Sequence, residues 1–143
     1  MSQRTLLEAQ NENIWSDEVR LAIGGTVVGR VVTTDATPTT LLSLPLLSSR
    51  TTFIQVQVIA RRTGGSSGTA EDGAAYLRAG TYKMVAGTPT LIGSVTSIHT
   101  AESQAGWDAT LAVSGGNVIV QVTGAADNNV TWNAKAFIDT VES

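Results

Sequence analysis

The stretch Trp107-Asp-Ala-Thr-Leu-Ala-Val-Ser-Gly-Gly-Asn-Val-Ile-Val-Gln-Val122 decides the fold class, because two alternating runs flank a pair of glycines. Glycine tolerates the positive φ angles of a two-residue primed turn, so Gly115-Gly116 is predicted to close a β-hairpin. The expected cross-strand pairs are Ser114 with Asn117, Val113 with Val118, Leu111 with Val120 and Ala109 with Val122. Since side chains alternate across a strand, this register puts the apolar residues, including Trp107, on one face.

The same β texture extends from Thr26 to the end of the chain, with Thr- and Val-rich runs separated by Gly, Ser, Asn or Pro clusters. The expected strands are 26–34, 40–47, 51–62, 75–85, 90–98, 107–113, 118–123 and 130–139. No helical stretch alternates with them, which excludes a parallel βαβ sheet. The chain is therefore predicted to be all-β, an antiparallel β-sandwich or jelly roll of seven or eight strands.

The sequence of three expected strands also indicates which of their residues face the core and which strand lies at an edge. Alternation places Ile54, Val56, Val58 and Ala60 on one face of their strand, and Val130, Trp132, Ala134, Ala136 and Ile138 on one face of the last strand. Phe137 falls on the outer face and is therefore a candidate contact residue. Pro45 cannot donate to a ladder, so its segment is expected at a sheet edge or a bulge.

The Gly/Ser-rich stretch 63–74 has no side chain able to pack a core, so it is expected to be an exposed loop that is mobile or ordered by a partner. Its candidate contact residues are Gly64, Gly65, Ser66, Ser67 and Gly68. These letters match G-x-S-x-G, and Asp72 and His99 follow in the order of a hydrolase triad. A nucleophile elbow needs a strand–turn–helix junction, whereas a strand follows here, so no catalytic residue is assigned.

The first 25 residues differ in texture from the rest. A capping box at Thr5–Glu8 and apolar residues at helical spacing indicate a short, partly helical arm, which Gly24-Gly25 ends. A helix this short needs docking to be ordered. The predicted docking residues are Leu6, Leu7, Ile14 and Trp15. The expected division is an anchoring arm over 1–25 and a β-sandwich domain over 26–143.

Composition excludes several classes of function. The formal net charge of -3 and pI near 5.0 argue against nucleic-acid binding, which needs clustered cations. The chain has no cysteine and one histidine, so neither a thiolate nor a His-rich metal site is expected, and no cofactor is assigned. The beginning of the chain lacks a signal-peptide pattern, and no apolar run is long enough to span a membrane. We expect a chain that is not exported by a cleaved signal and has no membrane partner.

Seven stretches occur in an order that resembles a β-domain of tailed-bacteriophage structural proteins, found in tail fibres and head- or tail-surface proteins. They are Thr33-Thr-Asp-Ala-Thr-Pro-Thr-Thr40, Val58-Ile-Ala-Arg-Arg-Thr-Gly-Gly65, Ala79-Gly-Thr-Tyr-Lys83, Thr90-Leu-Ile-Gly93, Gly106-Trp-Asp-Ala-Thr110, Gly116-Asn-Val-Ile-Val-Gln-Val-Thr-Gly124 and Asn129-Val-Thr-Trp-Asn-Ala134. The resemblance covers roughly three-quarters of the chain.

The resemblance implies a non-enzymatic virion component that forms a homo-oligomer, often a trimer. Low charge density, 15% of residues, is independently typical of chains whose surfaces are buried by neighbours. Because no fibrous repeat precedes the β-domain, the favoured interpretation is a capsid-decorating (cement) protein that binds the major capsid protein. The alternative is a tail fibre, adaptor or receptor- or glycan-binding tip attached to a tail protein. Either would lie on the virion surface, after assembly in the host cytoplasm.

Overall fold

Eight β-strands form between Gly25 and Glu142, which is the part of the chain that the computed structural model describes. They are β1 (Gly25–Thr33), β2 (Thr39–Pro45), β3 (Arg50–Gly65), β4 (Gly73–Val85), β5 (Thr88–Glu102), β6 (Asp108–Ser114), β7 (Asn117–Thr123) and β8 (Asn128–Glu142). Each of the eight expected strands is confirmed, and several extend beyond their predicted ends. The boundary at residue 25 that was predicted between arm and domain stays a prediction, because residues 1–24 lie outside the described part.

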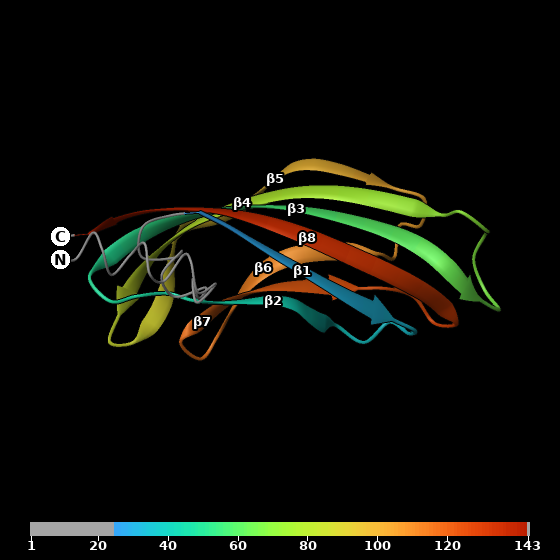
Figure 1. Cartoon of the computed structure of the whole chain (residues 1–143), viewed down its shortest axis with the longest axis horizontal. Helices are drawn as coiled ribbons and strands as arrows, with labels where there is room; N and C mark the ends of the chain where they lie inside the picture. The colour runs from blue at the N-terminus through green and yellow to red at the C-terminus, as the bar shows by residue number, and fades with distance from the viewer. Residues whose placement is uncertain (1–24, 143) are drawn as a thin grey trace, which may run out of the picture.

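The strands form two antiparallel sheets of unequal width (Figure 1). Five strands make one sheet in the order β1-β8-β3-β4-β5, and three make the other in the order β2-β7-β6. The first strand pairs with the last, β1 with β8, and the second pairs with the second-last, β2 with β7. The hairpins β3–β4 and β4–β5 stay in the first sheet, so the strands do not divide equally between the two layers. The all-β antiparallel prediction is thus confirmed, with five strands packed over three.

The β6–β7 hairpin has the register that the sequence predicts. Ser114 pairs with Asn117 and Ala109 with Val122, and Gly115 has a φ of 57°, as a primed turn requires at its first central position. Val113 pairs with Val118 and shares the face of Ala109 and Leu111, as predicted, but 41% of its surface is exposed. It lies next to the turn on β6, the edge strand of its sheet, where neighbours on one side are missing.

The core lies between the two inner sheet faces and is built around three aromatic side chains. The Trp107 and Trp132 rings lie 5.8 Å apart, and the Tyr76 ring lies 6.4 Å from that of Trp132. The indole Nε1 of Trp132 donates to Thr33 Oγ1 at 2.9 Å. The predicted inward residues of β3 and β8 are all buried: Ile54, Val56, Val58, Ala60, Val130, Trp132, Ala134, Ala136 and Ile138. Core packing, which the sequence assigned to Trp107 and Trp132, is confirmed.

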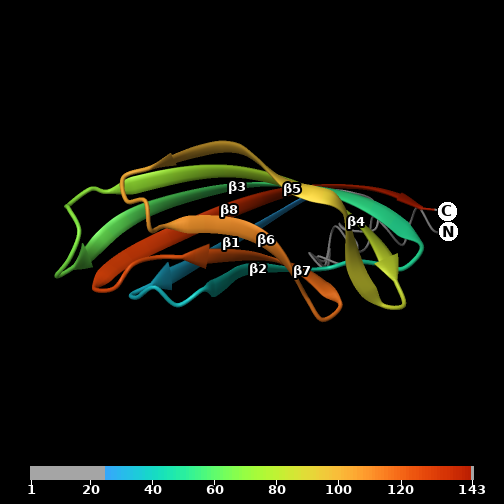
Figure 2. The same ribbon diagram turned by 180° about the vertical axis from the view of Figure 1, so that it is seen from behind.

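The ends of the sandwich are shaped by an edge proline and a bent hairpin. Pro45 ends β2, which is an edge strand with a bulge between Thr40 and Leu42, as its proline predicts. The β4–β5 hairpin bends across one end of the three-stranded sheet (Figure 2). Its bend coincides with a shift of pairing between Ala79 and Thr81 and a positive φ of 76° at Gly93.

Arg78 ties the two sheets together from a buried position on β4. Its Nε donates to the carbonyl of Ala109 on β6 at 2.9 Å, and one terminal nitrogen donates to the carbonyl of His99 on β5 at 2.7 Å. The guanidinium lies 5.0 Å from the centre of the Tyr76 ring and 3.7 Å from Asp108. A single cation thus satisfies backbone acceptors on β6 and β5, one in each sheet.

Arg78→Met should therefore destabilise the domain by about 2–3 kcal/mol, because buried carbonyls lose a charged donor. Lys83→Met on the same strand is the matched control, since Lys83 is exposed; a change of about 0.5 kcal/mol or less is expected. Denaturant unfolding of both variants measures the difference. Equal losses of stability in the two variants would contradict the assigned role of Arg78.

Candidate functional site

The outer face of the five-stranded sheet carries a row of exposed apolar side chains. The large apolar residues that are exposed on β1, β3 and β8 are Val28 (65%), Val32 (55%), Phe53 (43%), Ile59 (50%), Phe137 (41%) and Val141 (72%). Strand pairing brings them together, since β8 lies between β1 and β3. The outward position predicted for Phe137 is confirmed; its role in a contact stays a prediction. An apolar sheet face of this kind is typical of a surface that a partner covers.

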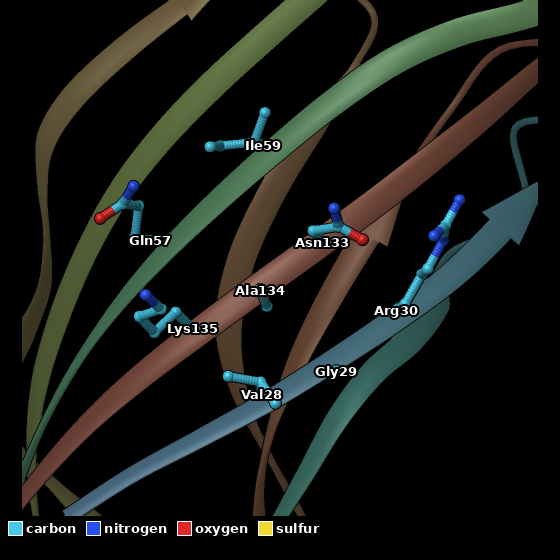
Figure 3. A pocket seen from close by; sticks show the side chains of 8 residues that line it. All are labelled: Val28, Gly29, Arg30, Gln57, Ile59, Asn133, Ala134 and Lys135. Atoms are coloured by element: carbon cyan, nitrogen blue, oxygen red, sulfur yellow. The ribbon is translucent and has the colours of Figure 1, made fainter.

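Part of this face is hollowed (Figure 3). A cavity of about 490 Å³ lies among side chains from β1, β3 and β8. Val28 and Ile59 give it apolar walls, while Arg30 and Lys135 contribute positive charge. A second hollow of about 230 Å³ shares Arg30 and Ile59 with the first. The two together form one groove along the sheet face, which we call the β1–β3 groove.

Strand β5 is one of the two edge strands of the five-stranded sheet, and it is exposed on both of its faces. Among its 15 residues only Pro89 is buried and only Val95 is half-buried. Leu91, Ile92 and Ile98 remain large and exposed. This exposure follows from the unequal sheets, because β5 extends beyond the three-stranded layer. Residues 88–101 also lack any Asp, Glu, Lys or Arg, the charges with which soluble proteins usually protect an edge.

The inner side of β5 is nevertheless held firmly to the domain. The Tyr76 hydroxyl on β4 donates to Glu102 Oε2 at 2.6 Å, and Arg78 donates to the carbonyl of His99. Burial first, and then the hydrogen bond and negative charge of Glu102, raise the pKa of Tyr76 far above its usual range. Burial also raises the pKa of Tyr82. The exposed edge is therefore a fixed surface supported by buried groups.

The Gly/Ser-rich loop is shorter and better supported than the sequence indicates. Gly64 and Gly65 belong to the end of β3, where they pair with Asn129 and Asn128, so the exposed loop begins at Ser66. The Arg62 side chain donates to the carbonyls of Gly65 and Ser67 at 2.8 and 2.9 Å. A cation within the same chain thus supports the start of this loop, and its mobility or ordering by a partner stays a prediction.

Three loops meet at one end of the domain. Gln104 Nε2 donates to Asp72 Oδ2 at 2.8 Å and to Asn128 Oδ1 at 3.0 Å. Gly68 has a φ of 78° and lies against Asn128 and Gln104. A Cβ at this position would collide with both side chains. The polar groups of this tip are therefore largely occupied with one another.

The residues of the rejected hydrolase triad do not form one functional group in this tip. Asp72 accepts the Thr69 amide at 3.0 Å and the Gln104 amide, and these hydrogen bonds lower its pKa. His99 was predicted in a loop, but it lies exposed within β5, paired with Leu77. The correction has a simple cause: β5 continues four residues beyond its predicted end. The carboxylate that a triad would need is thus already hydrogen-bonded to the Thr69 amide and to Gln104.

The described residues 25–142 contain no cluster of three or more His, Cys, Asp or Glu side chains that could hold a metal ion. In the same range no helix has the length and apolar character needed to cross a bilayer. The predicted docking residues Leu6, Leu7, Ile14 and Trp15 lie outside the described range.

The arrangement of the strands resembles that of a phage tail protein. The tailspike protein of Acinetobacter baumannii phage AM24 matches with a TM-score of 0.54 and 10% sequence identity over 89% of this chain. The likeness is one of fold. For the fold, it confirms the resemblance of this sequence to a β-domain of phage virion proteins. This chain spans 27% of the length of that tailspike, so the comparison concerns one domain of a longer protein.

A second match is the tailspike protein of Acinetobacter phage vB_ApiP_P1, with a TM-score of 0.40 and 14% identity over 82% of this chain and 22% of that one. No protein-family model and no curated protein sequence matches this chain.

The two tyrosines of the chain give a direct test of the buried contacts behind β5. Because folding raises both pKa values, their contribution to stability is complete below the unfolded tyrosine pKa of about 10 and declines above it. An alkaline titration followed by ultraviolet absorbance should show phenolate only when circular dichroism reports unfolding. Ionisation of either tyrosine near its ordinary pKa in the folded protein would contradict these contacts.

Proposed function

We propose that this chain is a non-enzymatic structural module of a phage tail spike or fibre, and that it works by assembling with copies of itself. Two observations support the proposal. The fold resembles a domain of a tailspike, and the β5 edge is long, uncharged and exposed on both faces. The fold likeness favours this tail alternative over the capsid-decorating interpretation that the sequence favoured.

The β5 edge carries the proposal, because an unprotected strand edge offers backbone donors and acceptors to another chain. Charged residues, which discourage edge pairing, are missing from 88–101. Two pairing irregularities occur along β4–β5, but the strand still extends over 15 residues. A second copy whose edge strand or loop lies against β5 would satisfy this backbone and cover Leu91, Ile92 and Ile98.

A closed ring of identical copies would pair the β5 edge of every copy. A contact between different surfaces of neighbouring copies closes into a ring if the rotation between them is right. We propose a homotrimer, with β5 at the contact between copies and a tail protein of the same virion as the other partner. The assembled protein then belongs to the virion surface.

Recognition of a glycan by the loop tip has less support than assembly. The side chains of Asp72, Gln104 and Asn128 hydrogen-bond within the tip, which leaves fewer polar groups for a sugar. The same commitment of Asp72 to backbone and amide donors supports a mechanical role and gives no support to hydrolysis.

The place of the chain on the virion tests the proposal directly. Antibodies raised against the exposed segment 66–70 should label purified particles at the tail in immunoelectron microscopy. The same antibodies adsorbed with free protein serve as the control. Labelling spread over the head would support the capsid-decorating role and contradict the tail assignment, and unlabelled particles would contradict both.

The role of β5 is tested by adding charge to the edge. Ile98→Lys combined with Thr100→Lys should convert the trimer to monomers, because pairing would bury unpaired charges. Val113→Lys, at an exposed valine on the other sheet, is the matched control and should leave the mass unchanged. Sedimentation analysis measures all three proteins. A monomeric unmodified protein at high concentration, or a trimer unaffected by both lysines, is incompatible with assembly through β5.

A further inference from the structure

The β1–β3 groove combines apolar walls with cations that lack partners. Val28 and Ile59 leave half or more of their surfaces in solvent. Among residues 25–142, Arg30 and Lys135 make neither an ion pair nor a side-chain hydrogen bond. Arg61, in the adjoining hollow, has only the loose contact with Glu71. An occupant with apolar side chains and several carboxylates would complement both properties.

The chain itself contains a segment with this chemistry. Residues 8–18, Glu-Ala-Gln-Asn-Glu-Asn-Ile-Trp-Ser-Asp-Glu, have four carboxylates and no lysine or arginine. Ile14 and Trp15 lie between the acidic positions 12 and 17. The charge of this stretch is opposite to that of the groove, and its apolar pair offers two side chains for the walls.

The place where the described chain begins makes this contact geometrically accessible. Gly25, the first residue of β1, lines a third hollow on the same outer face, beside Phe53 and Phe137. Its φ of 147° lies in a region that glycine adopts freely and other residues rarely adopt. The groove residue Val28 is three residues farther along β1, or about 10 Å.

The connecting length is also sufficient. Ten residues separate Trp15 from Gly25 by position in the sequence. Such a connection spans up to roughly 33–36 Å when extended and about 15 Å when helical. Either value exceeds the distance from Gly25 to the groove. A short tether also gives the segment a high effective concentration at its own domain, which favours binding within one chain over exchange between copies.

We propose that residues 11–18 bind in the β1–β3 groove of their own chain. Ile14 and Trp15 lie against Val28 and Ile59, and the flanking carboxylates pair with the cations Arg30, Lys135 and Arg61. The segment thereby covers part of the outer sheet face. This contact is separate from the β5 edge, so it can hold whether or not the proposed trimer forms.

Disulfide trapping tests the contact, because the chain has no cysteine of its own. Ser16→Cys leaves Trp15 intact, and Asn133→Cys places the second thiol at an exposed position on the groove wall. Mild oxidation of this full-length double variant should form a disulfide within single chains. The control pair, Ser16→Cys with Val113→Cys on the other sheet, should form at least tenfold less. Equal yields in the two pairs would overturn the proposal, and disulfides linking two chains would show exchange between copies and overturn binding within one chain.

The electrostatic part has its own test in the trapping variant. Arg30→Glu with Lys135→Glu should reduce the rate of disulfide formation severalfold, and changing Glu12, Asp17 and Glu18 to lysine in the same protein should restore it. The matched control is Lys83→Glu, an exposed cation on β4 away from the groove. A rate unaffected by the first change, or no recovery with the second, would contradict the pairing of these charges.

Discussion

Burial of two sheet faces of unequal width is the constraint on which the other features depend. The three-stranded layer covers the inner residues of β1, β8, β3 and β4, and Trp107, Trp132 and Tyr76 fill the space between the layers. It leaves most of β5 uncovered, since only Pro89 is buried and only Val95 is half-buried there. A strand that is well anchored through Arg78 and Tyr76 is consequently left exposed on both faces. The same packing leaves the outer face of the wider sheet uncovered.

The polar groups of the domain serve its structure. Arg78 satisfies carbonyls in both sheets, Arg62 holds the Gly/Ser-rich loop, and Gln104 joins three loops. The large surfaces that remain available are apolar or basic and belong to the β5 edge and the β1–β3 groove. Such surfaces suit contacts between protein chains, and this is why we propose a mechanical role within a phage tail.

Sequence patterns predicted the strands and faces because alternation directly reports which side of a strand is buried. The Gly115-Gly116 turn even gave the pairing of β6 with β7. The strand order was beyond reach, since the choice of sheet for β4 and β5 depends on contacts remote in sequence. His99 was misplaced because β5 lacks an apolar alternation that would mark its end. The missing alternation also indicated that neither face of β5 is buried in the core. Arg78 was missed because an inward arginine reveals its partners only when both sheets are assembled.

Amide hydrogen exchange across β5 tests the central claim, that sister copies complete the surface which the narrow sheet leaves open. The account predicts that amides on the free edge of residues 96–102 exchange slowly in concentrated full-length protein and become faster on dilution, while amides of β3 stay protected throughout. Rapid exchange along β5 at every concentration, with β3 equally protected, would contradict it.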